Sequence, residues 1–360
     1  MDLYRLVFRL VLARLDPETA HNLALRCLAL LGSTAGLLAG RPVRDTRLHL
    51  ERFGVPFANP LGLAAGFDKN AVAVPALLAL GFGHVEVGTV TPRPQPGNPA
   101  PRLFRLLEDE ALINRLGFPS EGIGAVAERL RALRGQPGVI GINVGKNRAT
   151  PLERAAQDYA LGLTALGPLS DYAVVNISSP NTAGLRALQQ RGQLDELCAA
   201  LLAARPRSRR GQPLPLLLKI APDLTDAELD DILDVALARG LDGLVVSNTT
   251  TAREGVRSPL AGEAGGLSGA PLRARSDALL AACFARAGRR LALVGVGGVF
   301  TAEHAWRKLL AGASLVQVYT GFVYRGPALP GQILAGLQQR LERFGLSRLD
   351  DVIGAGQRLG

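Results

Sequence analysis

Eight short apolar runs, rich in β-branched residues, recur between residues 61 and 321 and predict buried strands. They span residues 61–67, 84–90, 139–145, 172–178, 215–221, 243–249, 291–298 and 315–321. Stretches with helical periodicity separate most of them, at 75–80, 121–133, 153–166, 226–238, 275–287 and 302–310. Strands that are apolar throughout and alternate with helices predict an α/β fold, a (β/α)₈ TIM barrel. An open doubly wound sheet is the alternative, but no Gly-x-Gly-x-x-Gly motif opens its first unit.

The amino-terminal 40 residues show a different pattern, in which arginines interrupt an apolar helical stretch. Residues 3–13 are strongly apolar, but Arg5 and Arg9 rule out a secretory signal peptide. A capping sequence at 16–18, with proline at the first helical position, predicts a second helix to about residue 31. No window reaches the roughly 18 uninterrupted apolar residues of a spanning helix. We therefore expect two helices that lie in a membrane interface; the alternative is that they pack on the barrel or on another subunit.

The same pattern suggests where the parts of the chain divide. Residues 32–45 are predicted to be a linker, and residues 1–41 an amphipathic helical membrane segment. Residues 42–360 would form the (β/α)₈ barrel. The long gap between the second and third strands must contain an insertion, and residues 102–116 predict a hairpin or an added helix within it.

Composition narrows the range of functions. The chain has 360 residues and a net charge of +10, but only four of its 41 basic residues are lysines. No basic segment is interleaved with aromatic residues, so nucleic-acid binding is not favoured, whereas a basic surface suits anionic lipid. Cys27, Cys198 and Cys283 are widely spaced in helical stretches and predict reduced core thiols, with no metal or iron–sulfur spacing.

Polar residues cluster at the carboxyl ends of the predicted strands. The clearest cluster follows the fourth strand, where Asn176, Ser179 and Asn181 end an apolar run. In a barrel such ends converge on one face, where active sites lie. Three of the four lysines, Lys69, Lys146 and Lys219, fall at strand ends in a chain that otherwise uses arginine. We therefore expect them to serve a site.

The last two strand ends are rich in glycine and hydroxyl groups. Gly297-Gly298 follows the seventh strand, Tyr319-Thr320 ends the eighth, and Gly265–Gly269 forms another glycine-rich segment. The loops after strands seven and eight commonly bind phosphate in this fold, because glycines let backbone N–H groups approach the oxygens. A phosphorylated cofactor or substrate is predicted here.

The available side chains exclude some chemistries and favour another. The histidines and cysteines lie away from these strand ends, which removes Ser-His acyl transfer and metal-assisted hydrolysis. Asparagines and lysines suit a flat heterocycle that bears a carboxylate and carbonyl groups. A phosphate corner and a lysine on the fifth strand suit a flavin, whose reduced ring is anionic.

Nearly the whole chain resembles the class 2 dihydroorotate dehydrogenases, which associate with membranes and use quinones. The segments that carry the resemblance are Asn-Pro-Leu-Gly-Leu-Ala-Ala-Gly-Phe-Asp-Lys-Asn (59–70), Arg-Leu-Phe-Arg-Leu (102–106), Ile-Asn-Arg-Leu-Gly-Phe (113–118), Gly-Ile-Asn-Val-Gly-Lys-Asn (141–147), Asn-Ile-Ser-Ser-Pro-Asn-Thr (176–182), Leu-Lys-Ile-Ala-Pro-Asp (218–223), Ser-Asn-Thr-Thr (247–250) and Gly-Gly-Leu-Ser-Gly (265–269). Such a long set of motifs is highly specific.

The resemblance implies oxidation of dihydroorotate to orotate in pyrimidine biosynthesis, with FMN as hydride acceptor and a membrane quinone as final acceptor. Ser179 would be the catalytic base. The substrate would contact Lys69, Asn114, Arg115, Leu116, Gly117, Phe118, Asn176, Asn181, Asn248 and Thr249. FMN would contact Ala65, Gly66, Phe67, Asp68, Lys69, Thr89, Asn143, Asn176, Lys219, Ser247, Gly269, Gly298, Tyr319 and Thr320.

The resemblance also implies a quinone site at His21 and Arg105, with Val323 in place of a threonine, and a peripheral location on the cytoplasmic face of the cell membrane. Ser247 stands where relatives often have threonine, and the hydroxyl is kept.

Soluble class 1 relatives use a cysteine base and lack the helical leader. A class 1-like enzyme with another acceptor, or a non-catalytic, membrane-docked barrel that binds a phosphate ligand, are the alternatives. Residues 180–195 are the candidate lid.

Overall fold

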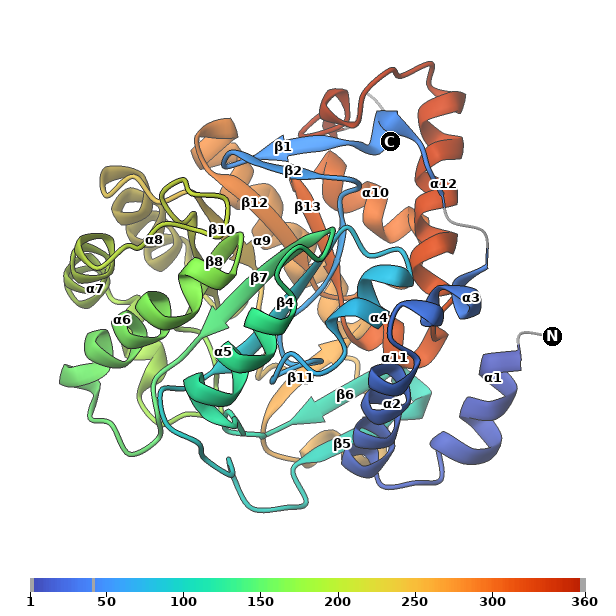
Figure 1. Ribbon diagram of the computed structural model, residues 1–360, viewed down its shortest axis with the longest axis horizontal. Coiled ribbons are helices and arrows are strands. Elements are labelled where there is room, and N and C mark those ends of the chain that lie inside the picture. The colour runs from blue at the N-terminus through green and yellow to red at the C-terminus, as the bar shows by residue number, and fades with distance from the viewer. Residues whose placement is uncertain (1–2, 41–42, 357–360) are drawn as a thin grey trace.

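Eight parallel strands close into a barrel in the computed structural model, which describes residues 3–40 and 43–356 (Figure 1). In order around the barrel they are β3 (Leu61–Leu63), β4 (His84–Val90), β7 (Val139–Val144), β8 (Tyr172–Asn176), β9 (Leu216–Ile220), β10 (Gly243–Val246), β12 (Ala292–Val296) and β13 (Leu315–Val318). The predicted TIM barrel is confirmed, and each strand falls within its predicted run. Nearly every strand residue is buried, as expected for a parallel sheet covered on its outer face.

Helices cover the outside of the barrel. They are α4 (Val74–Ala79), α5 (Gly122–Ala132), α6 (Ala155–Leu166), α7 (Arg191–Ala203), α8 (Asp226–Ala238), α9 (Arg273–Ala287), α10 (Ala302–Leu310), α11 (Thr320–Arg325) and α12 (Leu329–Arg343). Short 3₁₀ turns lie at 46–48, 107–109, 152–154, 167–169, 185–189, 259–262, 270–272, 288–290 and 349–351. The six predicted helices are present, whereas α7, α11 and α12 were not predicted. The best-capped helix, α8, has a capping box between Thr225 and Glu228.

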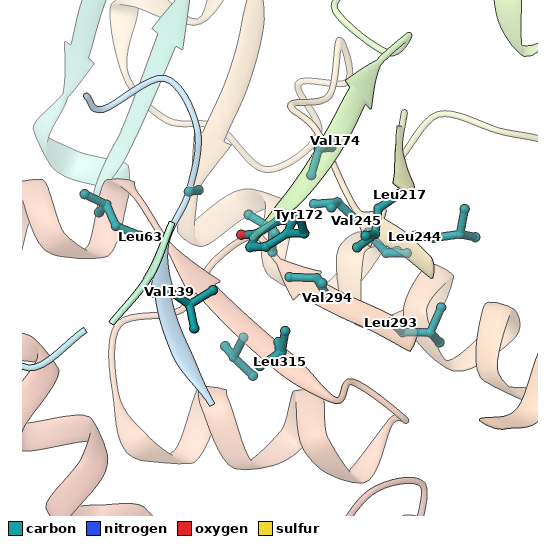
Figure 2. Packing of buried hydrophobic residues seen from close by; sticks show 14 of the residues in the cluster. Leu63, Val139, Tyr172, Val174, Leu217, Leu244, Val245, Leu293, Val294 and Leu315 are labelled. Carbon is teal, nitrogen blue, oxygen red and sulfur yellow. The ribbon is translucent and has the colours of Figure 1, made fainter. Parts of the chain in front are cut away.

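Two aromatic rings fill the amino-terminal half of the barrel interior. A Cβ atom on Gly62 would lie 2.0 Å from the His84 ring, and one on Gly141 would lie 2.2 Å from the Tyr172 ring. Glycines on β3 and β7 therefore make the space that these rings occupy. Figure 2 shows Tyr172 among buried aliphatic side chains, with Leu244 and Leu293 pointing away from its ring.

A small hairpin closes the same end. Its strands, β1 (Leu50–Arg52) and β2 (Val55–Phe57), pair antiparallel, and the Phe57 ring packs edge-on against His84 at 5.4 Å between centroids. Because the amino end is filled and covered, the carboxyl end of the barrel is the face where a site can open.

The insertion after β4 forms a hairpin, which was one of the two predicted alternatives. Strands β5 (Leu103–Leu106) and β6 (Ala111–Asn114) pair antiparallel, and β11 (Gly266–Gly269) adds to β6 to make a three-stranded sheet (Figure 1). This sheet brings the glycine-rich segment 265–269 beside the insertion, two regions about 150 residues apart in the chain.

The amino-terminal segment is almost continuously helical. It contains α1 (Leu3–Val7), a π-helical turn (Phe8–Leu12), α2 (Pro17–Leu31), a 3₁₀ turn (Gly32–Ala35) and α3 (Gly36–Ala39). The two predicted helices are confirmed, but the linker prediction is wrong for residues 32–39. A Cβ on Gly36 would lie 2.9 Å from the carbonyl oxygen of Ala79, so close packing on α4 holds this segment helical. The predicted boundary at residue 41 lies outside the described residues.

Residues 17–39 form one helical stretch that is long and apolar enough to cross a membrane, judged by length and composition alone. A spanning helix was not predicted from the sequence, because that prediction required an uninterrupted apolar window. In the structure the stretch lies along the barrel, where Leu28 and Ala35 are buried, while Leu30 and Leu37 on its outer side are 88% and 86% exposed. Within the described residues, nine of the twelve exposed large apolar side chains belong to positions 6–38.

Candidate active site

A cavity of about 140 Å³ opens at the carboxyl ends of the barrel strands. Most of the residues predicted to bind substrate or cofactor line it together: Ala65, Gly66, Lys69, Thr89, Asn114, Leu116, Gly117, Phe118, Asn176, Ser179, Asn181, Lys219, Ser247, Asn248, Thr249, Gly269, Gly298, Tyr319 and Thr320. They come from all parts of the barrel and from the insertion, and the closed sheet brings them together.

Five other predicted residues lie outside this lining. Asn143 is fully buried beneath Thr89, and Phe67 faces a second cavity. The Asp68 carboxylate accepts hydrogen bonds from the N–H groups of 72 and 73, and burial raises its pKa. Arg115 forms an ion pair of 2.7 Å with Glu263. Lys146 donates to the carbonyl oxygens of 147 and 150, so this third strand-end lysine does not reach the cavity as expected.

Two lysines carry the positive charge of the cavity. Lys219 is 5% exposed, and Lys69, which is partly buried, lines the same cavity. Neither ammonium group has a hydrogen-bond acceptor among the described residues. Burial lowers the pKa of Lys69 to about 8 and also lowers the pKa of Lys219. A buried cation without a partner is costly, so the pair favours an anionic occupant.

The loop after β8 places Ser179 at the cavity wall, where it is 5% exposed. Its Oγ accepts a hydrogen bond of 3.3 Å from the Asn181 backbone N–H. The Asn181 side chain donates to Asn114 Oδ1 at 3.2 Å, which ties this loop to the insertion. No Asp, Glu or His is among the described residues that line the cavity, so no carboxylate or imidazole there could serve as the base in place of Ser179.

Amide side chains form the floor in a continuous hydrogen-bonded chain. The Thr89 hydroxyl donates to Asn143 Oδ1 at 2.6 Å and accepts from Asn176 Nδ2 at 3.0 Å. Asn248 Nδ2 donates to Ser178 Oγ at 2.9 Å and lies 3.4 Å from Asn176 Oδ1. Asn176 and Asn248, the two of these amides that line the cavity, therefore present fixed groups to it, which suits carbonyl and N–H groups on a flat ring.

The glycine-rich corner leaves room only for backbone. Gly269 has φ +100° and a Cβ there would lie 2.4 Å from the carbonyl oxygen of Glu110, while one on Gly298 would lie 2.4 Å from Arg273 Cβ. Ser268 and Thr320 place their hydroxyl oxygens 2.8 Å apart across this corner. Closely packed glycine backbone and two hydroxyl groups at one point of the cavity suit the oxygens of a phosphate group.

A second cavity, of about 240 Å³, lies between the amino-terminal helices and the barrel. Its lining is mainly apolar, and includes Tyr4, Phe8, Leu28, Phe67, Phe322 and Val323. The predicted quinone residues His21 and Arg105 both line it. Burial lowers the pKa of His21 to about 3, so its ring is neutral at physiological pH. Arg105 Nη1 donates to the carbonyl oxygens of 13 and 15, while its buried Nε has no partner in the described chain.

Cys27 lines this second cavity and is exposed, whereas Cys198 and Cys283 are buried. The prediction of core thiols is therefore correct for two cysteines and wrong for Cys27. Cys27 lies on the side of α2 that faces the cavity rather than the barrel core.

Tyr319 and Leu103 separate the two cavities, because both residues line each of them and also a third, polar cavity of about 260 Å³ beside Lys69. The Tyr319 hydroxyl donates to the carbonyl oxygen of Gly66 at 3.3 Å, and its ring packs edge-on against Phe67 at 5.9 Å. Leu112 also lines both of the first two cavities, so the wall between them is a fixed aromatic ring and two leucines.

A profile of the family described as dihydroorotate dehydrogenase matches residues 47–341, most of the chain. The chain belongs to the dihydroorotate dehydrogenase family. It is 53% identical to a dihydroorotate dehydrogenase (quinone) of Anaeromyxobacter dehalogenans, over 98% of this chain and 97% of that protein. It is 56% identical to the enzyme of the same description from Thermus thermophilus, over 94% of this chain and 97% of that protein.

Solved structures agree with this dihydroorotate dehydrogenase assignment. A crystal structure of the Eimeria tenella protein in complex with ferulenol superposes with a TM-score of 0.89 at 41% identity, over 94% of this chain and 95% of that one. Its ligand-free counterpart gives a TM-score of 0.88, over 95% and 100%. The chain is therefore an oxidoreductase of this family, whose members use a flavin.

Sequence reasoning missed two polar residues inside the barrel. Glu86 on β4 and Gln317 on β13 are fully buried and hydrogen-bond each other at 2.7 Å. Both lie within apolar runs, where they were counted as parts of strands. An acidic side chain in a strand that is buried on both faces is a signal that could have identified Glu86.

Proposed function

We propose that this protein is a membrane-associated dihydroorotate dehydrogenase. It oxidises (S)-dihydroorotate to orotate in de novo pyrimidine biosynthesis, with FMN as the bound flavin and a membrane quinone as the final electron acceptor. The observation that supports this most directly is the pair of unpartnered ammonium groups, on Lys69 and Lys219, in one cavity with an amide floor and a glycine-rich phosphate corner.

FMN suits the residues present. Its phosphate would bind at Gly269, Gly298, Tyr319 and Thr320, which all line the cavity and where any residue larger than glycine at 269 or 298 would collide with neighbouring protein atoms. Its ring would lie over Ala65, Gly66, Thr89, Asn176, Lys219 and Ser247, with Asn143 acting through Thr89. The Lys219 ammonium would stabilise negative charge on a reduced ring. When bound, the flavin accepts the hydride that leaves C6 of dihydroorotate.

Dihydroorotate would occupy the part of the cavity nearest the insertion. Lys69 supplies the counter-charge for its carboxylate, and the amides of Asn114, Asn181 and Asn248 pair with its ring carbonyl and N–H groups. Leu116, Gly117, Phe118 and Thr249 complete the walls. The asparagine network holds these donors and acceptors in place before substrate binds, which lowers the entropic cost of orienting it.

Ser179 would take the proton from C5 of the substrate. A serine hydroxyl is a weak base, so the developing negative charge must be stabilised by the nearby cations and amide donors. The Asn181 N–H donates to Ser179 Oγ, which orients a lone pair and leaves the hydroxyl proton free to point elsewhere. The buried position of the loop excludes bulk water from the reacting carbon.

The second cavity would bind the quinone. Its apolar walls suit a prenylated ring, and Arg105 and the neutral His21 are the polar groups able to contact a quinone carbonyl. The exposed leucines on α2 and α3 surround the segment that forms this cavity, so quinone would enter directly from lipid. This arrangement supports a peripheral location of residues 1–40 on the cytoplasmic face of the cell membrane.

The proposed function can be tested by following the colour of the protein under anaerobic conditions. Purified protein should be yellow, should bleach on adding dihydroorotate, and should recover its colour on adding a soluble quinone analogue. A colourless protein would favour the alternative of a non-catalytic barrel. Faster reoxidation by fumarate than by quinone would favour a class 1-like enzyme, although serine at 179 and the helical leader both argue against that class.

A further inference from the structure

Glu86 has no role in the function proposed above, yet it occupies the centre of the barrel directly below the cavity floor. It projects from β4 and is 0% exposed. One carboxylate oxygen accepts from Asn143 Nδ2 at 2.8 Å, and the other accepts from Gln317 Nε2 at 2.7 Å. Both contacts are from amide donors, so each carboxylate oxygen has a partner that offsets its burial.

The carboxylate determines which way the floor amides point. Because Glu86 can only accept, Asn143 must turn its NH₂ group down and its oxygen toward Thr89. The Thr89 hydroxyl then gives its proton to that oxygen and offers a lone pair to Asn176 Nδ2. The Asn176 oxygen is left to face Asn248 and Ser178. A single acceptor at the bottom thus sets the direction of every hydrogen bond up to the substrate-facing amides.

The same carboxylate is the buried counter-charge of Lys219. The two groups are not within ion-pairing distance, but the negative charge of Glu86 raises the pKa of Lys219 while burial lowers it. Three other polar side chains face Glu86: the neutral His84 and Gln317, which lie 3.5 Å apart, and Tyr172, whose hydroxyl is 3.5 Å from the acid. Burial lowers the pKa of His84 to about 3, and the pKa of Tyr172 is raised, so neither changes charge near neutral pH.

We propose that Glu86 is a positioning residue that aligns the amide floor and balances the charge of Lys219 beneath the flavin ring. This inference rests on the proposed function. In this proposal Glu86 touches neither substrate nor cofactor. It sets how strongly the cavity floor favours a reduced, anionic flavin ring.

Three variants separate these effects. Glu86→Gln keeps the shape and removes the charge; Gln317 can turn over to accept from the new NH₂ group, since its Oε1 has no partner in the described chain. Glu86→Leu removes the acceptor as well. Tyr172→Phe is the matched control, because it alters the same buried cluster through a contact of only 3.5 Å and keeps the carboxylate.

The readouts are the midpoint potential of the bound flavin at pH 6 and the flavin dissociation constant. We expect Glu86→Gln to shift the potential to more positive values, since an uncompensated Lys219 stabilises the anionic reduced ring. Glu86→Leu should also weaken flavin binding, by roughly 10- to 100-fold. Tyr172→Phe should leave both close to the wild-type values.

An unchanged or more negative potential in Glu86→Gln, with flavin bound, would overturn the assignment. So would an equal shift in Tyr172→Phe, because the effect would then report general disturbance of the cluster. If wild-type protein binds no flavin, the proposed function itself fails, which is a distinguishable result. If Glu86→Leu does not fold, the potential of Glu86→Gln still decides.

Discussion

The two cavities on either side of Tyr319 are built in contrasting ways. The first draws its polar groups from strand ends spread over 250 residues, and its lysines, amides and glycines are fixed by the closed sheet. The second is formed mostly by one local helical segment laid on the barrel, with Arg105 and His21 as isolated polar groups in apolar walls. Under the proposed function, the contrast means that substrate oxidation would depend on the rigid barrel, whereas quinone access would depend on the docked amino-terminal helices. Changes in the first cavity should therefore affect the reductive half-reaction and changes in the second the oxidative one.

The largest effect should come from removing the base in the first cavity. Ser179→Ala should slow flavin reduction by dihydroorotate by about 10²- to 10⁴-fold, because proton removal from C5 loses its acceptor. Flavin content and reoxidation by quinone should stay normal. Anaerobic stopped-flow absorbance measures both steps, and near-normal reduction would show that Ser179 is not the base.

Replacing the substrate's counter-charge should be the next most severe change. Lys69→Ala should weaken dihydroorotate binding roughly 100-fold, the loss expected for a charge-assisted contact in a buried site. Lys146→Ala is the control, since that lysine also lies at a strand end but donates to loop carbonyl oxygens outside the cavity. Titration of flavin absorbance with substrate gives the affinities, and equal losses in the two variants would contradict the assignment.

The pKa of Lys69 also predicts a pH dependence. Because burial lowers it to about 8, Lys69 is charged below that pH and becomes neutral above it. The apparent affinity for dihydroorotate should therefore fall as pH rises through about 8, and the fall should be absent in Lys69→Ala. Steady-state KM measured between pH 6 and 9.5 checks this, and a flat wild-type profile would exclude an essential ammonium.

A change in the second cavity should spare substrate oxidation. Arg105→Leu should slow reoxidation by a soluble quinone about tenfold, since one charge-assisted contact to a carbonyl is lost. Reduction by dihydroorotate should remain within twofold of wild type, which serves as the internal control. Slowing of both half-reactions would mean that the separation between the cavities is not functional.

The smallest effects are expected at the outer surface of the second region. Leu30→Glu and Leu37→Glu should each weaken binding to anionic vesicles by about 1 kcal/mol without altering flavin content. Leu161→Glu, at a 56% exposed leucine on α6, is the control that should not change it. Cosedimentation with vesicles measures the binding of each variant. Removing residues 1–40 should abolish vesicle binding entirely. Persistent sedimentation of that truncated protein would mean that another surface is the anchor.

The sequence predicted the two regions unequally, for physical reasons. Strands buried on both faces produce continuous apolar runs, so all eight could be predicted. The polar residues at their ends gave most of the residues predicted for the first cavity. The residues 32–39 were misread because Gly32, Gly36 and Gly40 suggest a loop, whereas Gly36 serves close packing on α4. Helix α7 was missed because it begins with Arg191-Gly192 and has no side-chain cap.

Individual side chains were harder to predict than strand ends. Lys146 lies at a strand end yet bonds to its own loop, and Cys27 faces a cavity that exists only after α2 docks. Glu86 is invisible as a functional residue until its neighbours on β7 and β13 are known. In each case the deciding partner lies far away in the chain, where local patterns carry no information.

Tyr319, Leu103 and Leu112 form a partition between a polar, charged cavity and an apolar one. Under the proposed function, electrons would cross this partition while the pyrimidine and the quinone head stay on their own sides of it. The two reactants would then never need to meet, so one could stay in water and the other in lipid. A bulkier or smaller residue at position 103, which is not among the proposed cofactor or substrate contacts, would change that insulation while leaving those contacts in place.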